Sequence, residues 1–202
     1  LHPSLGHWFA LPSSRKSRYV PIDEREALME QMGLDIEKDR RNFGDFEGLG
    51  ASLTLANVNN DRDWRKPGLA VLGIDPTAGF SKFRLGGLQA FGMEEPDLML
   101  KALVELVRIV KPLFACVDVK SRTPEKGLVT YQIDRRLYQH REFFGWMGFV
   151  PAQITHSQIL DAHDVHPVEG LGTVIVSVPG VFDPTDDAQV DKVHRVEMDL
   201  AS

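Results

Sequence analysis

The feature that most constrains the fold is the amphipathic segment at residues 94–110. Its apolar side chains recur three and four positions apart, which predicts an α-helix: Met99, Ala102, Leu103, Leu106, Val107 and Val110. Only a narrow polar stripe remains, formed by Lys101, Glu105 and Arg108. Because most of its circumference is apolar, this helix must be covered by other elements of the chain.

Short apolar segments on both sides of this helix predict β-strands. They are bounded by Gly, Pro, Asn and Asp, and several are rich in β-branched residues. In chain order they are residues 7–11, 53–58, 69–74, 80–88, 113–119, 149–154 and 173–178. Strands and helices alternate too irregularly for a doubly wound sheet. We therefore predict an α+β fold, with a largely antiparallel sheet and a long central helix and a C-terminal helix packed on it.

The rest of the chain divides into further helices and loops. A helical stripe covers residues 23–32, and Gly33 is interpreted as the helix stop. Asp183 is the expected N-cap of a terminal helix that reaches about Leu200, and residues 133–144 have mixed helical character. Residues 35–50, 121–127 and 156–170 are polar or glycine-containing, and we expect them to be irregular.

Composition and charge limit the class of protein. Of the 202 residues, 43% are apolar and 26% charged, as in globular proteins, and this length predicts a single domain over residues 1–202. The chain has 23 Lys+Arg and 29 Asp+Glu, a net charge of −6, which gives no electrostatic reason to bind nucleic acid and favours a basic partner. Cys116 is its one cysteine, which suits a reducing cytoplasm. No apolar run is long enough for a membrane span, so we expect no membrane association.

Acidic residues concentrate in three parts of the chain. Nine acidic residues stand against four basic ones from Asp23 to Glu47, and six against two from Asp183 to Asp199. A further cluster lies between Asp161 and Glu169. Such clusters usually form a solvated surface, but complementary charge also speeds the encounter with a basic protein. By charge alone, the residues expected to contact such a partner are Asp35, Glu37, Asp39, Asp45, Glu47, Asp161, Asp164 and Glu169.

A metal-dependent hydrolase is the alternative function. Asp161, His163, Asp164 and His166 offer carboxylates and imidazoles, which bind first-row metals. Their crowded spacing matches no metal-site signature, so a polar loop is the simpler interpretation. Cys116 lies in an apolar run and is interpreted as a small buried hydrophobe rather than a nucleophile.

A nuclease site is a second catalytic alternative. The Asp118-Val119-Lys120 segment has the acid-x-lysine form found in nucleases of the restriction-endonuclease fold, where carboxylates hold a divalent ion. The nearest upstream acid at a strand end is Asp75, and it does not lie on the preceding element. All catalytic patterns are thus incomplete, and we expect no catalytic residue, no cofactor and no bound metal.

Several segments, taken in chain order, resemble the immunity protein 52 family of bacterial polymorphic toxin systems. Residues 145–151, Gly-Trp-Met-Gly-Phe-Val-Pro, resemble the family's Gly-Trp-Met and the short apolar strand after it. Residues 49–55 resemble its glycine-led strand, and residues 112–119 the strand after its central helix. Residues 172–176 and 182–200 resemble its closing strand and helix. The resemblance runs from about Trp8 to the end of the chain.

The resemblance implies a cytoplasmic immunity protein that is not an enzyme. Such a protein binds a cognate toxin of bacterial competition, for example one exported by type VI secretion, and covers its active site or DNA-binding cleft. The toxins that neighbour this family usually carry a restriction-endonuclease-like nuclease domain. Gly145, Trp146 and Met147 are expected to mark the fold, with the Trp and Met in the core, rather than the binding surface. The chain departs from the family pattern at residues 53–57, which lack the expected tryptophan, and at the long stretch 79–92.

Overall fold

The computed structural model describes residues 3–14, 17–45, 52–75, 79–87, 97–125, 127–139 and 144–201. Its internal contacts divide the chain into two compact units, Leu1–Met93 and Glu94–Ser202. A domain is defined by its ability to fold independently, whereas these units are defined by internal contacts alone. The expectation of a single domain over residues 1–202 therefore stays a prediction. The strands of the described residues pair antiparallel in sheets of five, four and two strands. With helices beside these sheets, the predicted α+β class is confirmed.

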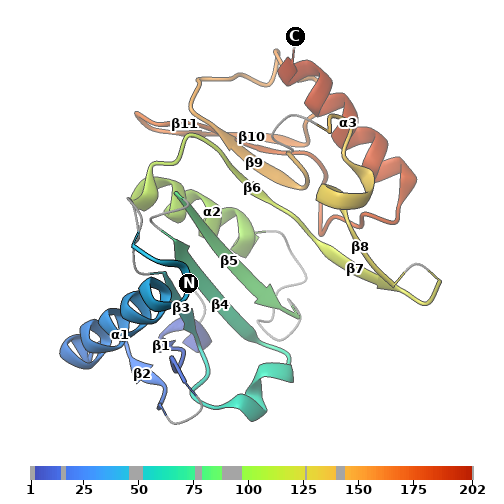
Figure 1. The fold of residues 1–202 in the computed structure, drawn as a ribbon. Coiled ribbons are helices and arrows are strands. Elements are labelled where there is room, and N and C mark those ends of the chain that lie inside the picture. Colours follow the sequence, from blue (N-terminus) through green and yellow to red (C-terminus); the bar gives the residue numbers. More distant parts are fainter. Residues whose placement is uncertain are drawn as a thin grey trace. The chain divides into compact units, whose positions relative to one another are not determined.

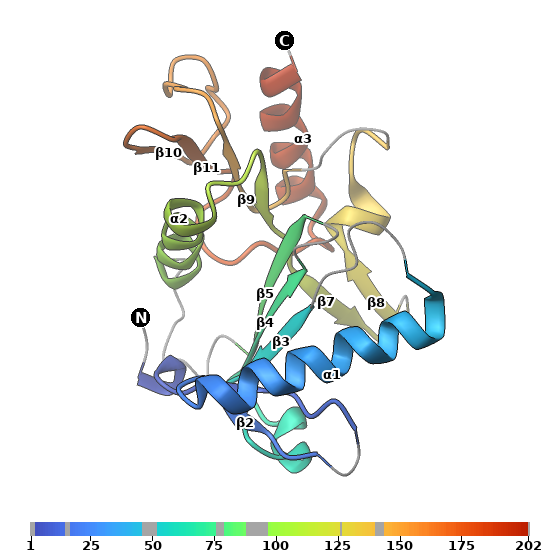
Figure 2. The ribbon, with the colours of Figure 1, turned by 60° about the vertical axis from the view of Figure 1, so that its left-hand side comes forward.

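The first unit contains the five-stranded sheet, in the order β2-β1-β3-β4-β5. Its strands are β1 Phe9–Ala10, β2 Val20–Pro21, β3 Leu53–Ala56, β4 Leu69–Asp75 and β5 Phe80–Gly86. The 3-10 helices η1 Pro3–Leu5 and η2 Asp61–Arg65 and the α-helix α1 Arg25–Phe43 complete it. Figures 1 and 2 show α1 beside the β1–β2–β3 side of this sheet. There Ala27 and Leu28 pack against Ala10, Val20 and Leu55.

The predicted end of the first helix is wrong. Gly33 lies inside α1, which continues to Phe43 through a segment expected to be irregular. Glycine costs a helix interior only about 1 kcal/mol, and the residues after it include good helix formers such as Leu, Glu, Lys and Arg. A Cβ at Gly33 would meet no atom within 4 Å, so the helix passes this position without a close contact.

The second unit is built around the four-stranded sheet, in the order β10-β11-β9-β6. Its strands are β6 Ala115–Val117, β9 Met147–Val150, β10 Asp164–Val168 and β11 Gly172–Val176. The strands β7 Lys120–Thr123 and β8 Gly127–Thr130 form a separate hairpin, followed by a π-helical turn, η4 Tyr131–Arg135. The helices are α2 Asp97–Val110 and α3 Asp187–Ala201. No helix among the described residues is both long enough and apolar enough to cross a bilayer.

Strand β11 is buried along its whole length, and the rest of the unit packs around it. Figure 1 shows α3 on one side of its sheet and α2 on the other. Ile175 packs with Val196 of α3, together with Phe144, Ile159 and Ala162. Helix α2 contacts β6 and buries Leu98, Ala102, Leu103 and Val107. Of the predicted stripe, Ala102, Leu103 and Val107 are thus buried, Met99 and Leu106 are half-buried, and Val110 is 48% exposed.

Three local predictions in this unit are wrong, the first two because strand pairing decides them and the third because a later aspartate caps the helix. Residues 121–127, expected as a loop, belong mostly to the β7–β8 hairpin, which turns before Gly127 at a φ of 72°. Strand β10 lies inside the segment 156–170 that was expected to be irregular, and it pairs with β11 from Asp164↔Val176 to Val168↔Gly172. The terminal helix begins at Asp187, since Asp186 accepts hydrogen bonds from the backbone N–H groups of Ala188 and Gln189.

The Gly-Trp-Met segment lies in the core of the second unit. Trp146 and Met147 are 1% and 0% exposed. Gly145 has a φ of 64°, and a Cβ there would lie 3.0 Å from the carbonyl oxygen of Val117. The backbone N–H of Trp146 donates to that same oxygen (3.1 Å). The chain therefore runs so close to β6 that a residue without a Cβ is favoured at position 145.

We expect Gly33→Ala to raise the free energy of unfolding by about 0.5–1 kcal/mol, because alanine loses less backbone entropy in a helix. Urea denaturation followed by circular dichroism measures the change. A lower stability would contradict α1 as a continuous helix through this residue.

We expect Gly172→Ala to lower the free energy of unfolding by about 3 kcal/mol, because a Cβ at Gly172 would lie 2.2 Å from the Val150 carbonyl oxygen. Gly170→Ala is the matched control, since Gly170 has a φ of 70° but open space around it. It carries only the left-handed backbone penalty of about 1 kcal/mol. Equal losses in the two variants, measured by urea denaturation, would contradict the close packing of β11 against β9.

Candidate functional site

Three of the acidic residues expected to contact a partner lie on α1, and they do not share one face of it. Asp35 and Asp39, four positions apart, are both half-buried, whereas Glu37 is exposed. Burial raises the pKa of the Asp35 carboxyl, and the nearby Lys38 opposes that shift. Asp35 and Asp39 are therefore poorly placed to meet a partner, while Glu37 is well placed.

Two further predicted residues follow the end of α1. The Asp45 carboxylate is exposed but accepts a hydrogen bond from Arg40 Nε at 3.2 Å, which offsets its charge. Glu47 lies outside the described residues.

An exposed acidic stripe runs along the outer side of α1. Glu26, Glu30 and Glu37 lie four and seven residues apart, so they project from the same side of the helix, and all three are exposed. Met29 and Leu34 flank this stripe and are 59% and 49% exposed. Charge counting did not single out Glu26 and Glu30 as contact residues. The spacing of four residues from Glu26 to Glu30 and of seven from Glu30 to Glu37 would have placed all three on one side of a helix.

In the second unit, two of the three predicted acidic residues have partners. Asp161 accepts from Arg195 Nε at 2.9 Å. On β10, Asp164 Oδ2 lies 2.9 Å from His166 Nε2, and its Oδ1 accepts from the Val165 N–H. Glu169, in the turn after β10, is exposed. Among the described carboxylates predicted to bind a partner, Glu37 and Glu169 are thus the exposed ones with no ion-pair partner in the described part of the chain.

The metal-site alternative gains no support from the geometry. Asp161 and His163 flank the buried Ala162 at the start of β10, and Asp161 is held by Arg195. Across the described residues, no group of three or more His, Cys, Asp or Glu side chains is arranged to hold a metal ion.

The nuclease alternative falls on residues of both units. Asp75 ends β4 in the first unit, whereas Asp118 and Lys120 belong to the second. Asp118 is half-buried and accepts a hydrogen bond from the Tyr131 N–H at 3.2 Å, so its carboxylate holds the start of η4. Burial raises the pKa of Asp118, and its backbone hydrogen bonds oppose that shift. These contacts support a structural role for Asp118.

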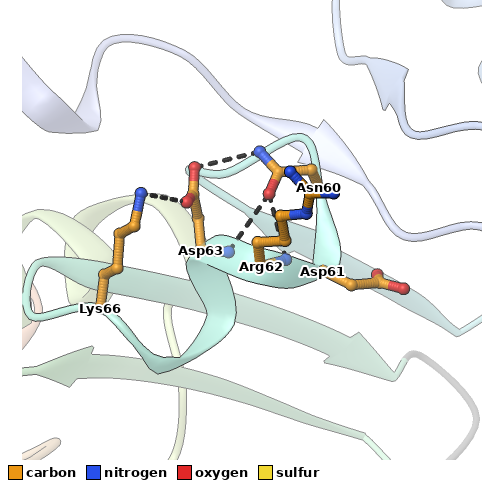
Figure 3. Close-up of a pocket in the computed structure, with 5 residues that line it drawn as sticks. All are labelled: Asn60, Asp61, Arg62, Asp63 and Lys66. Carbon is orange, nitrogen blue, oxygen red and sulfur yellow. Dashed lines mark hydrogen bonds and ion pairs between the residues drawn. The ribbon is translucent and has the colours of Figure 1, made fainter.

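The connection between β3 and β4 carries an open pocket of about 660 Å³ (Figure 3), lined by Asn60, Asp61, Arg62, Asp63 and Lys66. Asn60 caps η2, its side-chain oxygen accepting from the N–H groups of Arg62 and Asp63. Asp63 forms an ion pair with Lys66, and Asp61 accepts from the Tyr19 hydroxyl at 2.8 Å. Because Asn60, Asp61 and Asp63 are already bonded to neighbouring residues, we interpret these side chains as stabilising the connection rather than as a binding site.

A buried polar cluster in the second unit was missed by the sequence analysis. Glu197 on α3 is only 6% exposed, and its Oε1 accepts from the Phe144 N–H at 2.8 Å. Beside it, the buried Tyr131 hydroxyl has no hydrogen bond within the described residues, and burial, then the Glu197 charge, raise its pKa. The signal was present in the sequence, since Glu197 continues the apolar stripe of Val190 and Val193 at helical spacing.

Comparison with known proteins adds no assignment, since no protein-family model and no curated protein matches the chain.

We expect Asp118→Asn to gain stability relative to the original chain as the pH rises. Because the folded state raises the pKa of Asp118, the carboxylate's contribution is most favourable below the ordinary aspartate pKa of about 3.9 and is lost as the pH rises through the folded value. Asparagine keeps an acceptor for the Tyr131 N–H and does not titrate. Urea denaturation of both proteins at pH 4 and pH 7 measures this difference, and a difference independent of pH would contradict it.

Proposed function

We propose that this chain is a cytoplasmic immunity protein that binds a cognate nuclease toxin and covers its active site or DNA-binding cleft. In this function it acts by binding rather than by catalysis. The sequence resemblance that runs through residues 145–151 supports the class of protein, and the net charge of −6 supports a basic partner.

The observation that carries the proposal is the exposed stripe of Glu26, Glu30 and Glu37 on α1. Within the described residues none of these carboxylates has an ion-pair partner. A row of unpaired carboxylates on a rigid helix presents charge in the manner of a phosphate backbone. A nuclease cleft, which must attract DNA, carries the complementary positive charge.

The apolar side chains beside the stripe support a protein partner over a small ion. Met29 and Leu34 expose apolar surface at its two sides, and an unbranched methionine adapts to an irregular partner surface. Protein interfaces combine such an apolar contact with a polar rim. In the proposed complex the carboxylates steer the encounter, and the burial of Met29 and Leu34 slows dissociation.

Co-expression with the product of the adjacent upstream gene tests the proposed function. Cells that express this product alone should die, and cells that also express the chain should survive. Purified chain should then form a stable complex with the toxin domain and stop its cleavage of DNA. Survival that does not depend on the chain, or the lack of a complex, would overturn the proposal.

We expect the triple variant Glu26→Gln, Glu30→Gln, Glu37→Gln to associate with the toxin at least tenfold more slowly at low ionic strength, because steering depends on charge. Glutamine has nearly the helix propensity of glutamate, so α1 should be retained. Stopped-flow association at increasing salt measures the effect, which should shrink as salt screens the charges.

A matched control removes the same charge from three other exposed carboxylates that form no ion pair within the described residues: Asp97→Asn, Glu125→Gln and Asp191→Asn. This control should associate like the original chain apart from a small effect of net charge. Equal slowing of both triple variants would show that total charge, rather than the stripe on α1, guides the encounter.

A further inference from the structure

A small cavity lies at the C-terminal end of α3, inside the second unit. Its volume is about 130 Å³, and its lining residues are Phe114, Tyr138, Phe144, Val150, Glu197, Leu200 and Ala201. Most of these described lining residues are aromatic or aliphatic, and Glu197 is the one acidic residue among them.

Within the described residues, Glu197 is held in place by a hydrogen bond and not by an ion pair. The Phe144 N–H donates to Oε1, while no Lys, Arg or His in the described part of the chain forms an ion pair with this carboxylate. A carboxylate that is 94% buried loses most of its hydration, so a cation that reaches it gains a strong interaction. Glu197 therefore provides an oriented acceptor for a positively charged group.

The walls suit the rest of an organic cation. The rings of Phe114 and Phe144 meet edge to face with their centroids 6.5 Å apart. Aromatic rings attract ammonium groups, and the aliphatic walls favour a hydrocarbon stem. An enclosed cavity of about 150 Å³ holds a benzene-sized molecule, so this open hollow of about 130 Å³ has room for a four-carbon amine.

We propose that this cavity binds a primary alkylammonium group of about the length of a lysine side chain, with Glu197 accepting from its nitrogen. Two sources share this chemistry: a lysine of the toxin partner and a free small amine. The first source rests on the proposed function, and the second does not.

Titration of the full chain with n-butylammonium chloride, followed by ¹H–¹⁵N NMR, tests the site itself. The Phe144 amide, which donates to Glu197, should shift in a saturable manner, and 1-butanol of the same length should bind at least tenfold more weakly. The absence of a saturable shift, or equal binding of the alcohol, would overturn the proposal.

Variants separate the carboxylate from the walls. Glu197→Gln keeps an acceptor for the Phe144 N–H and should weaken n-butylammonium binding at least tenfold, whereas Asp191→Asn on the exposed side of α3 should leave it unchanged. Ala201→Leu extends an exposed residue at the cavity and should block binding with Glu197 intact. Unchanged binding in either cavity variant would overturn the assignment, and Ala201→Leu decides the matter if Glu197→Gln fails to fold.

The toxin complex distinguishes the two sources. If a toxin lysine occupies the cavity, Glu197→Gln should weaken toxin binding at least tenfold, and n-butylammonium should compete with the toxin. If n-butylammonium binds but neither effect occurs, the ligand is a free amine. A failed co-expression test removes only the lysine source, because the titration with n-butylammonium needs no toxin.

Discussion

The second unit depends on the burial of one strand on both faces. β11 pairs with β9 and β10 along its length, and Ile175 packs against Val196 of α3. The Thr173 hydroxyl donates to the Ala152 carbonyl at 2.8 Å and accepts from the Ile154 N–H, so even its polar side chain is satisfied. After the strand, the Ser177 hydroxyl donates to the Gly145 carbonyl. These contacts join β11 to α3 and to the Gly-Trp-Met segment, so each of the three stabilises the position of the others.

Among the buried residues of this unit that the structure describes, Glu197 stands out as the one with an acidic side chain. It occupies an apolar position of α3, where a leucine would pack without the cost of burying a carboxylate. Proteins place residues that are unfavourable for core stability mainly at functional sites. The hydrogen bond from the Phe144 N–H fixes one oxygen of the carboxylate and brings no positive charge to it. This arrangement fits a binding site better than it fits added stability.

The surplus of acidic residues is distributed unevenly once side-chain partners are considered. Arg40, Arg195 and His166 lie against Asp45, Asp161 and Asp164. A carboxylate paired with a neighbouring cation contributes little to the field that an approaching protein meets. The exposed stripe on α1, which has no ion-pair partner among the described residues, therefore dominates the electrostatic argument for a basic partner, although charge counting selected only Glu37 of its three residues.

Sequence patterns were sufficient where the pattern is local. The apolar stripe of α2, the strands β3, β4 and β5 and the antiparallel α+β class follow from periodicity and turn residues. They were insufficient where distant residues decide the outcome. β10 carries Asp164 and His166 and became a strand because β11 offers it a hydrogen-bonding edge. Which acidic residues are paired, half-buried or exposed depends on neighbours far along the chain, such as Arg195 for Asp161 and Phe144 for Glu197. Charge is a property of each residue, but its availability to a partner is a property of the packed structure.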